Sequence, residues 1–199
     1  MTVDYPVVET FYSVQGEGFW SGHGAFFIRL GGCDVGCSWC DTRHSWEADR
    51  HPRRSIAALV TEAIAVPSPQ VIITGGEPLL HDLAPLTEAL GRAGRRVHLE
   101  TSGAHPFQGN FHWVTFSPKT FRSPHPSIYA QAQELKVVVA TEADLAWAET
   151  QSALVPQGVP RYLQPEWRSP QAQDLVYGYV LDHPVWRISL QTHKILKVR

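Results

Sequence analysis

The sequence has few cysteines, little net charge and no long apolar run. Only three cysteines occur among 199 residues, and the formal net charge is −2. Such a charge gives no basic field that would follow a phosphate backbone, so we expect no nucleic-acid partner. A membrane-spanning helix needs roughly 20 apolar residues in a row, so we expect no membrane contact. The first residues also lack a basic segment followed by an apolar one, which predicts no secretory signal.

The rest of the composition is typical of one folded domain. Hydrophobic residues make up 43% of the chain, and seven tryptophans argue further against disorder. The length is sufficient to bury a sizeable core, and no repeat or low-complexity linker divides the chain. We therefore predict a single domain over residues 1–199. Unpaired, clustered cysteines are stable in a reducing compartment, which predicts a cytoplasmic protein.

The three cysteines are the most informative feature of the chain. Cys33, Cys37 and Cys40 fall within eight positions, with the spacing C-x3-C-x2-C. A disulfide would leave one thiol unpaired and would close only a very small loop. Thiolates this close together are more typical of metal ligands. Gly36, beside the middle cysteine, allows the backbone to wrap tightly around a bound object.

Two kinds of metal site fit this spacing. A structural zinc site needs four protein ligands, so the fourth would come from a residue such as His23 or His44. An iron–sulfur cluster held by three thiolates would instead leave one iron open to a reacting molecule. An apolar strand precedes the cysteines, and the segment 71–78, Val-Ile-Ile-Thr-Gly-Gly-Glu-Pro, follows them. Together these features resemble the radical S-adenosylmethionine (SAM) superfamily.

Apolar segments followed by polar loops recur along the chain and predict an α/β fold. We expect strands over 7–12, 25–30, 71–74, 96–99, 113–116, 135–140, 161–163 and 186–190, and helices over 56–66, 82–93, 142–151 and 171–181. This order predicts a mainly parallel sheet with the site at the carboxyl ends of its strands. Residues 104–111 are too few for a crossover helix, and a full barrel typically needs about 250 residues. We therefore predict an incomplete TIM-type barrel with few crossover helices.

Three polar features are informative, and two of them have two interpretations each. Arg29 lies in an apolar strand and needs an anionic partner, either a structural carboxylate such as Glu17 or an anionic substrate. Thr42, shortly after the last cysteine, fits the capping position of a following turn. The segment 13–18 is either an ordinary turn or a binding loop that offers an amide, a carboxylate and flexible backbone.

The segments around the cysteines are similar to the 7-carboxy-7-deazaguanine synthase family of the queuosine and deazapurine pathway. The similar segments run in order along the chain and cover 11–18, 27–33, 40–42, 100–103, 117–119, 163–165 and 193–194. The resemblance implies a lyase that contracts the ring of 6-carboxy-5,6,7,8-tetrahydropterin, depends on Mg²⁺, and releases ammonia. It also implies an incomplete barrel, a homodimer and an electron donor such as flavodoxin or ferredoxin.

The resemblance also implies roles for individual residues. A [4Fe–4S] cluster is expected on Cys33, Cys37 and Cys40, Mg²⁺ on Thr42, and no catalytic residue beyond the cofactors. Expected SAM contacts are Gly75, Gly76, Glu77, Gly103, Ser117, Pro118, Lys119, Gln164 and Pro165. Expected substrate contacts are Val14, Gln15, Gly16, Glu17, Arg29 and Thr101. Glu77 would accept a hydrogen bond from the ammonium of SAM, and the planar fork of Arg29 would match a substrate carboxylate. The chain departs from the family pattern at Glu166-Trp167 and at 197–199. The remaining histidines are expected to be structural or on the surface.

Other functions compete with this one. Another radical SAM enzyme, such as one that installs a glycyl radical on a partner protein, would not need Gln15, Arg29 and Thr42 together. It would also present an exposed apolar docking surface. A non-catalytic zinc module would have a fourth ligand near the cysteines. An electron carrier would lack a SAM pocket and would usually have a fourth cysteine.

Overall fold

The computed structural model describes residues 3–199, and its nine strands form one sheet. The strands are β1 (Asp4–Val14), β2 (Gly24–Leu30), β3 (Arg53–Ser55), β4 (Gln70–Gly75), β5 (Arg96–Thr101), β6 (Trp113–Phe116), β7 (Glu134–Val139), β8 (Arg161–Pro165) and β9 (Trp186–Ile188). Their order across the sheet is β3-β1-β2-β4-β5-β6-β7-β8-β9. From β2 to β9 every neighbouring pair is parallel, which confirms the predicted mainly parallel sheet. The antiparallel edge formed by β1 and β3 was not predicted.

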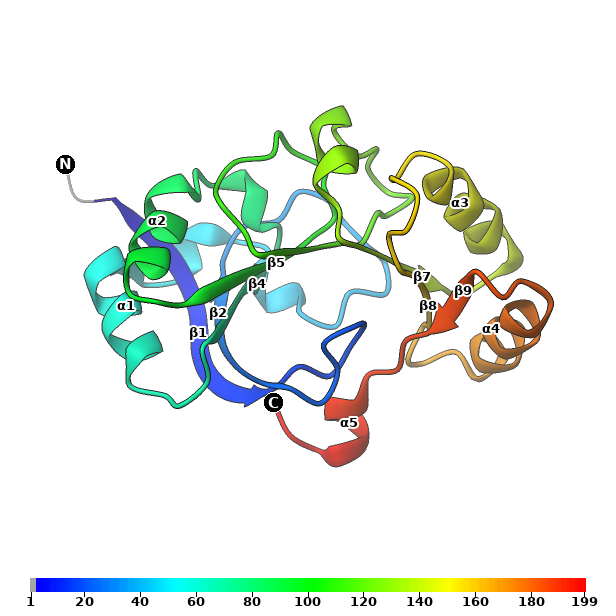
Figure 1. The fold of residues 1–199 in the computed structure, drawn as a ribbon, viewed down its shortest axis with the longest axis horizontal. Coiled ribbons are helices and arrows are strands. Elements are labelled where there is room, and N and C mark those ends of the chain that lie inside the picture. The colour runs from blue at the N-terminus through cyan, green and yellow to red at the C-terminus, as the bar shows by residue number, and fades with distance from the viewer. Residues whose placement is uncertain (1–2) are drawn as a thin grey trace.

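The helices lie along the outer, convex side of the curved sheet, except the last one, which lies on the open side (Figure 1). They are α1 (Ile56–Ile64), α2 (Ala84–Arg92), α3 (Glu142–Ser152), α4 (Pro170–Asp182) and α5 (Thr192–Leu196), with short 3-10 turns η1 (Arg43–Ser45), η2 (Ala48–Arg50), η3 (Pro78–Leu80) and η4 (Pro126–Gln131). No helix joins β5 to β6, and only η4 lies between β6 and β7. The prediction of an incomplete barrel with few crossover helices is therefore confirmed.

Alternation along the strands separates the core from the concave face. Phe26 and Ile28 of β2 belong to the main core, together with residues of α1 and α2 such as Leu59 and Leu86. Phe27, one position along the strand, belongs to a second small cluster. Because successive strand residues point to opposite faces, Arg29 shares the concave face with Phe27. Period-two alternation thus places a charged residue inside the barrel and its apolar neighbours under the helices.

The segment around α5 closes part of the open side of the barrel. In Figure 1 the red α5 lies beside the end of the blue strand β1. The amide of Thr192 donates to the carbonyl of Gly16 at 2.9 Å, and the amide of Gly18 donates to the Ser189 hydroxyl at 2.9 Å. These bonds join the two ends of the chain across the gap in the barrel. Within residues 3–199, no helix combines the length and apolar character needed to cross a membrane.

Candidate active site

A cavity of about 480 Å³ lies at the carboxyl ends of the strands. Every residue that the sequence assigned to the site lines it, except Gly103 and Pro118. Gly103 packs instead against Phe116 and Ile128, so it lies behind the cavity wall. Residues from almost the whole chain therefore meet at one place, as expected for the strand ends of a parallel sheet.

The cysteine loop forms one wall of this cavity. Cys33, Cys37 and Cys40 are all free thiols that line the cavity. Gly36 has a φ of 76°, the left-handed conformation that the tight turn between the cysteines requires. Burial raises the pKa of the Cys33 thiol, and it raises the pKa of Cys37 to about 11. Burial therefore disfavours thiolates that have no cation beside them, and three thiols on one wall fit a cluster that leaves one iron open. Within residues 3–199, no group of three or more His, Cys, Asp or Glu side chains is set around a single metal ion.

The Gly-Gly-Glu-Pro segment packs directly against the cysteine loop. The amide of Gly76 donates to the carbonyl of Leu30 at 3.0 Å, and that of Glu77 donates to Gly32 at 2.8 Å. A Cβ atom on Gly76 would lie 2.2 Å from the carbonyl oxygen of Gly32 and 2.8 Å from Cβ of Cys33. Glycine is thus required by the protein's own backbone, in addition to any contact with SAM.

The carboxylate of Glu77 is fully engaged by the protein. It accepts from the amides of Leu79 at 3.0 Å and Ser102 at 2.8 Å, and from the hydroxyls of Thr101 and Ser102. A carboxylate offers about four acceptor sites, so all of them are occupied. Glu77 therefore ties the loop after β5 to the Gly-Gly-Glu-Pro segment. Its expected bond to the ammonium of SAM stays a prediction.

Arg29 has a structural partner, but not the one suggested by the sequence. Its Nε lies 3.0 Å from Oε1 of Glu9, because the register of β1 and β2 places these two residues opposite each other. Oε2 of the same glutamate lies 2.7 Å from Nη1 of Arg199. Glu17 pairs instead with Lys136, so the suggested Arg29–Glu17 pair is wrong. Arg29 still lines the cavity, so a role toward substrate is compatible with the bond through Nε.

Thr42 stands at the start of η1, yet its side chain makes no capping hydrogen bond. The carbonyl of Thr42 accepts from the amide of Ser45 at 2.8 Å and from its hydroxyl at 2.7 Å. The Thr42 hydroxyl lies 3.6 Å from the sulfur of Cys40 and lines the cavity. The capping interpretation is therefore wrong, and the hydroxyl is placed where it could bind an ion.

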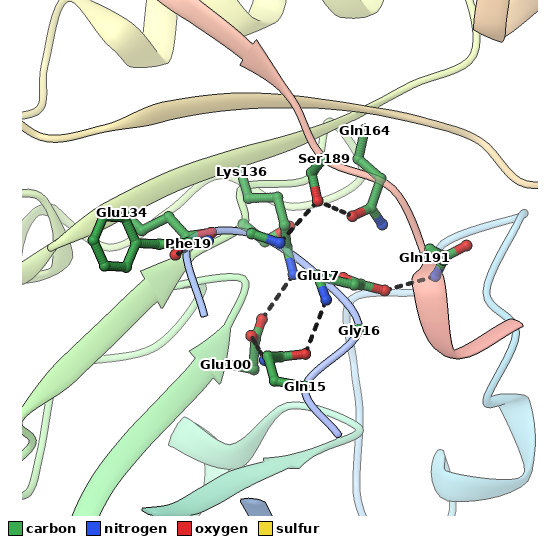
Figure 2. Close-up of polar contacts among 12 residues, drawn as sticks. Gln15, Gly16, Glu17, Phe19, Glu100, Glu134, Lys136, Gln164, Ser189 and Gln191 are labelled. Carbon is green, nitrogen blue, oxygen red and sulfur yellow. Dashed lines mark hydrogen bonds and ion pairs between the residues drawn. The ribbon is translucent and has the colours of Figure 1, made fainter. Parts of the chain in front are cut away.

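A charged cluster of buried and partly buried residues lines the cavity and forms what we call its floor. Figure 2 shows the polar contacts within this cluster. Nζ of Lys136 lies 2.5 Å from Glu17 and 3.0 Å from Glu100, and its side chain is only 4% exposed. Gln191 donates to Glu17 at 2.7 Å, and Gln15 donates to Glu100 at 2.9 Å. Burial opposes ionisation of Glu17, but Lys136 holds the pKa of that carboxyl at about 2. Burial raises the pKa of Glu100, with a smaller contribution from Glu17.

Several lining residues were given no role in the site from the sequence, although some lie in the segments discussed above. They are Glu100, Lys136, Trp167, Gln191, His193 and Lys194. Lys136 carried the same signal as Arg29, a charge inside an apolar strand. His193 was expected to be structural or on the surface, and burial lowers the pKa of its imidazole. Lys194 links α5 to the cysteine loop, because its Nζ lies 2.6 Å from the carboxylate of Asp41. The same Nζ lies 5.4 Å from the ring of Trp167.

Comparison with known proteins finds relatives over the whole length of the chain. Residues 27–125 match the radical SAM superfamily. The chain is 50% identical over its full length to a 7-carboxy-7-deazaguanine synthase of a Synechocystis species, and it covers 96% of that protein. Identity to the synthase of the same name from Flavobacterium psychrophilum is 42%, over 97% of this chain and 92% of that protein. The crystal structure of QueE from Escherichia coli superimposes with a TM-score of 0.84 at 32% identity, covering 94% of each chain.

These matches decide between the interpretations of the cysteine motif. Radical SAM proteins carry a [4Fe–4S] cluster and SAM, so the zinc module and the plain electron carrier are set aside. Full-length identity to synthases favours that family over an enzyme that activates a partner protein. The chain therefore belongs to the 7-carboxy-7-deazaguanine synthase family of radical SAM enzymes.

Proposed function

We propose that this enzyme converts 6-carboxy-5,6,7,8-tetrahydropterin into 7-carboxy-7-deazaguanine and ammonia. One observation carries the proposal: a single cavity joins the cysteine wall to a polar floor suited to a small heterocyclic acid. Its volume of about 480 Å³ lies within the range of small-molecule sites. The relatives' name states the product, and the chemistry of the lining residues supports the substrate.

Arg29 is the proposed partner of the substrate carboxylate. Its Nε is held by Glu9 at 3.0 Å, which fixes the plane of the guanidinium. The terminal nitrogens then present a planar fork to an anionic group in the cavity, a geometry suited to a carboxylate. The stacked rings of Phe11 and Phe27, with centroids 4.8 Å apart, provide an apolar surface beside it.

The cofactors would occupy the opposite wall. Cys33, Cys37 and Cys40 would hold the cluster, and the proposed SAM contacts would come from the Gly-Gly-Glu-Pro segment, Ser117 and Lys119, with Gln164 and Pro165 beyond them. When bound, these cofactors supply the one-electron chemistry that removes a hydrogen atom from the substrate. Lys119 donates to the Ser117 carbonyl at 2.7 Å, which fixes its ammonium on this wall. Buried lining residues such as Gln164 keep bulk water from the reacting atoms.

Mg²⁺ is proposed to bind at Thr42. The Thr42 hydroxyl is free of a capping bond and lines the cavity on the cysteine side. A neutral hydroxyl combined with substrate oxygens and water suits a hard ion that keeps much of its hydration. We further propose a homodimer in the cytoplasm, built from a single radical SAM domain and reduced by a flavodoxin- or ferredoxin-like donor.

An anaerobic assay tests the reaction directly. The protein would be reconstituted with iron and sulfide and then given SAM, a reductant, Mg²⁺ and 6-carboxy-5,6,7,8-tetrahydropterin. Mass spectrometry is expected to detect 7-carboxy-7-deazaguanine, with SAM required but not consumed and with less product when Mg²⁺ is omitted. Cleavage of SAM without this product would rule out the proposed substrate.

A further inference from the structure

The middle of the cysteine loop, residues 34–39, is not held by backbone hydrogen bonds. At the two ends of the loop, the amide of Cys33 donates to the carbonyl of Trp46 at 3.0 Å, and the amide of Cys40 donates to that of Cys37 at 3.2 Å. Among the described residues, none of the amides of 34–39 donates to a backbone carbonyl. The conformation of this segment therefore depends on side-chain contacts with its neighbours.

Asp34 contacts two other loops at once. Its Oδ1 lies 2.9 Å from Nε2 of His105, in the loop after β5, and its Oδ2 lies 2.5 Å from Nη1 of Arg122, in the loop after β6. The same Nη1 lies 3.4 Å from the backbone carbonyl of Asp34. An ionised carboxylate can only accept, so Nε2 of His105 carries the proton of that bond. One side chain between the first two cysteines thus joins three segments that are distant in the sequence.

Both partners of Asp34 are fixed within their own loops. Lys119 and Arg122 form a β-bridge, so residues 119–122 make a tight turn that orients the arginine. After His105, the amide of Phe107 donates to the hydroxyl of Ser127 at 2.9 Å and ties that loop to η4. The His105 side chain is only 16% exposed. Because these groups are ordered already, their bonds to Asp34 cost little additional conformational entropy.

The turn 119–122 contacts the cysteine loop at a second point, Trp39. The ring of Phe121 lies edge-on to the Trp39 ring, with centroids 6.1 Å apart, and Nζ of Lys119 lies 5.5 Å from the centre of the same ring. The turn therefore meets the cysteine loop on both sides of Cys37. Removal of the Asp34 contacts would leave the side that contains Cys33 without its polar attachment to the turn.

We propose that Asp34 is a positioning residue that clamps the cysteine loop to His105 and Arg122, and that this clamp retains the iron–sulfur cluster on the three thiols. A cluster with three protein ligands keeps only two when the loop opens at one cysteine, so resistance to opening slows the loss of iron. Partly exposed ion pairs contribute little to the stability of a whole fold, but local opening of a loop depends on its few own contacts. The inference concerns the cysteine loop alone and does not depend on the proposed substrate.

Release of iron to a chelator tests the clamp. Each protein would be reconstituted anaerobically with iron and sulfide and then mixed with excess bathophenanthroline disulfonate, whose coloured ferrous complex reports the rate. Asp34→Ala removes both bonds and is expected to release iron about tenfold faster than the wild type, and Arg122→Met about threefold faster. The double variant should be no faster than Asp34→Ala, because both changes break the same clamp.

The direction of the change separates positioning from a simple effect of charge. Nearby positive charge stabilises thiolates, and negative charge destabilises them. By charge alone, Asp34→Ala would slow the release of iron and Arg122→Met would accelerate it, whereas loss of the clamp accelerates it in both. Asp34→Asn keeps an acceptor oxygen for both partners and should stay within about threefold of the wild type. Melting temperatures of the iron-free proteins should match, since the clamp acts on one loop.

Arg92→Met is the matched control. It breaks an exposed ion pair of α2, in which Nη1 of Arg92 lies 2.6 Å from Glu88, and it should release iron at the wild-type rate. Iron release in Asp34→Ala that is as slow as in the wild type, or slower, would overturn the proposal. So would effects of Asp34→Ala and Arg122→Met that multiply in the double variant, because the two side chains would then act independently. If Asp34→Ala does not fold, a wild-type rate in Arg122→Met would overturn the proposal by itself.

Discussion

At the scale of single residues, the buried charges differ in how much of their bonding capacity the protein uses. Glu77 is 1% exposed and has four protein donors, so its carboxylate stabilises the loops around the site. Arg29 is bound to Glu9 through Nε alone and lines the cavity. Both charged residues lie in or directly after an apolar strand. The sequence alone therefore gives no signal that distinguishes a structural charge from a ligand-binding one. The number of unused donors and acceptors separates a structural charge from one that can bind a ligand.

Replacing Arg29 with lysine tests its role toward the substrate. Arg29→Lys keeps a positive charge near Glu9 but removes the planar fork, so kcat/KM for the pterin is expected to fall about ten- to a hundredfold. The melting temperature should change little, because a partly exposed ion pair contributes at most about 1 kcal/mol. Steady-state kinetics and thermal unfolding would measure the two effects.

Glu9→Gln is the matched control for this substitution. It removes the charge that pairs with Arg29 but leaves the guanidinium in place, so kcat/KM should stay within about threefold of the wild type. An equal loss in both variants would indicate that the Arg29–Glu9 pair only supports the fold. Unchanged kcat/KM in Arg29→Lys would contradict a role for Arg29 in binding the carboxylate.

At the scale of elements, the end of β4 and the cysteine loop form one packed unit. β2 and β4 pair in parallel up to Leu30 and Gly75, and the backbone bonds continue beyond them through Gly76 and Glu77. The start of the cysteine loop, Gly32-Cys33, is therefore set by the strand register as well as by its own turns. The two sequence motifs of the superfamily are structurally one feature, because the amide of Glu77 donates to the carbonyl of Gly32, the residue directly before Cys33.

A methyl group at Gly76 is expected to disturb both motifs. In Gly76→Ala, the new Cβ would lie 2.2 Å from the backbone oxygen of Gly32, which cannot move without shifting Cys33. We expect a loss of about 2–3 kcal/mol in the free energy of unfolding, as is typical of overpacking. Iron bound per chain after reconstitution should fall as well. Chemical denaturation and iron analysis would measure these changes.

Gly91→Ala provides the comparison within the same chain. Gly91 lies in α2, and a Cβ there would meet no atom within 4 Å. Alanine favours a helix over glycine by about 1 kcal/mol, so this variant should be equally or more stable than the wild type, with full iron content. If Gly76→Ala matches Gly91→Ala in both measurements, the close packing of the two motifs is not needed for stability or for iron binding.

At the scale of the whole molecule, the barrel is closed by polar contacts between distant segments. Ser189 and Thr192 bond to the loop after β1, and Lys194 pairs with Asp41 of the cysteine loop. Glu134, two residues before Lys136, accepts from the amide of Phe19 at 3.2 Å and from the Trp113 indole at 3.1 Å. These contacts bring several ionisable groups out of water, so the stability of the whole fold depends on pH.

Glu134 gives this dependence a definite sign. Burial raises the pKa of its carboxyl from 4.5 to about 7, so the folded protein keeps a proton that the unfolded chain has released. The contribution of Glu134 to stability therefore falls as the pH rises from about 4.5 to about 7, by at most about 3 kcal/mol. His98 acts in the opposite direction, since burial lowers the pKa of its imidazole from 6.5 to about 4, and its contribution to stability rises with pH over that interval.

A comparison of variants isolates Glu134 from His98. Glu134→Gln carries no charge at any pH, so its stability relative to the wild type should increase between pH 5 and pH 8, by about 1–3 kcal/mol. Urea denaturation at both pH values would measure this difference, which cancels the contribution of His98. Glu142→Gln, at an exposed residue of α3, should show the same difference from the wild type at both pH values. A constant difference for Glu134→Gln would contradict the assignment.

The sequence alone determined the features that depend on local pattern. Alternation of apolar strands and polar loops predicted the parallel sheet, and the short segment 104–111 predicted the missing helix between β5 and β6. Ser55 directly precedes α1, and its hydroxyl accepts from the amide of Ala58, the local cap that serine favours at a helix start. The spacing of Cys33, Cys37 and Cys40 and the glycines of the later motif indicated the superfamily. These signals are readable because a turn, a cap or a period depends on neighbouring residues.

Only the tertiary structure decided which charges meet. Arg29 pairs with Glu9 rather than Glu17 because the register of β1 and β2 sets them opposite each other. Lys136 reaches Glu17 across 119 positions and Glu100 across 36, and no local pattern encodes such distances. Ion pairs between distant segments depend on how strands curve into a barrel and on which faces close against each other. The family could therefore be identified from the sequence, whereas the ion-pair partners on the floor of the cavity could be identified only from the fold.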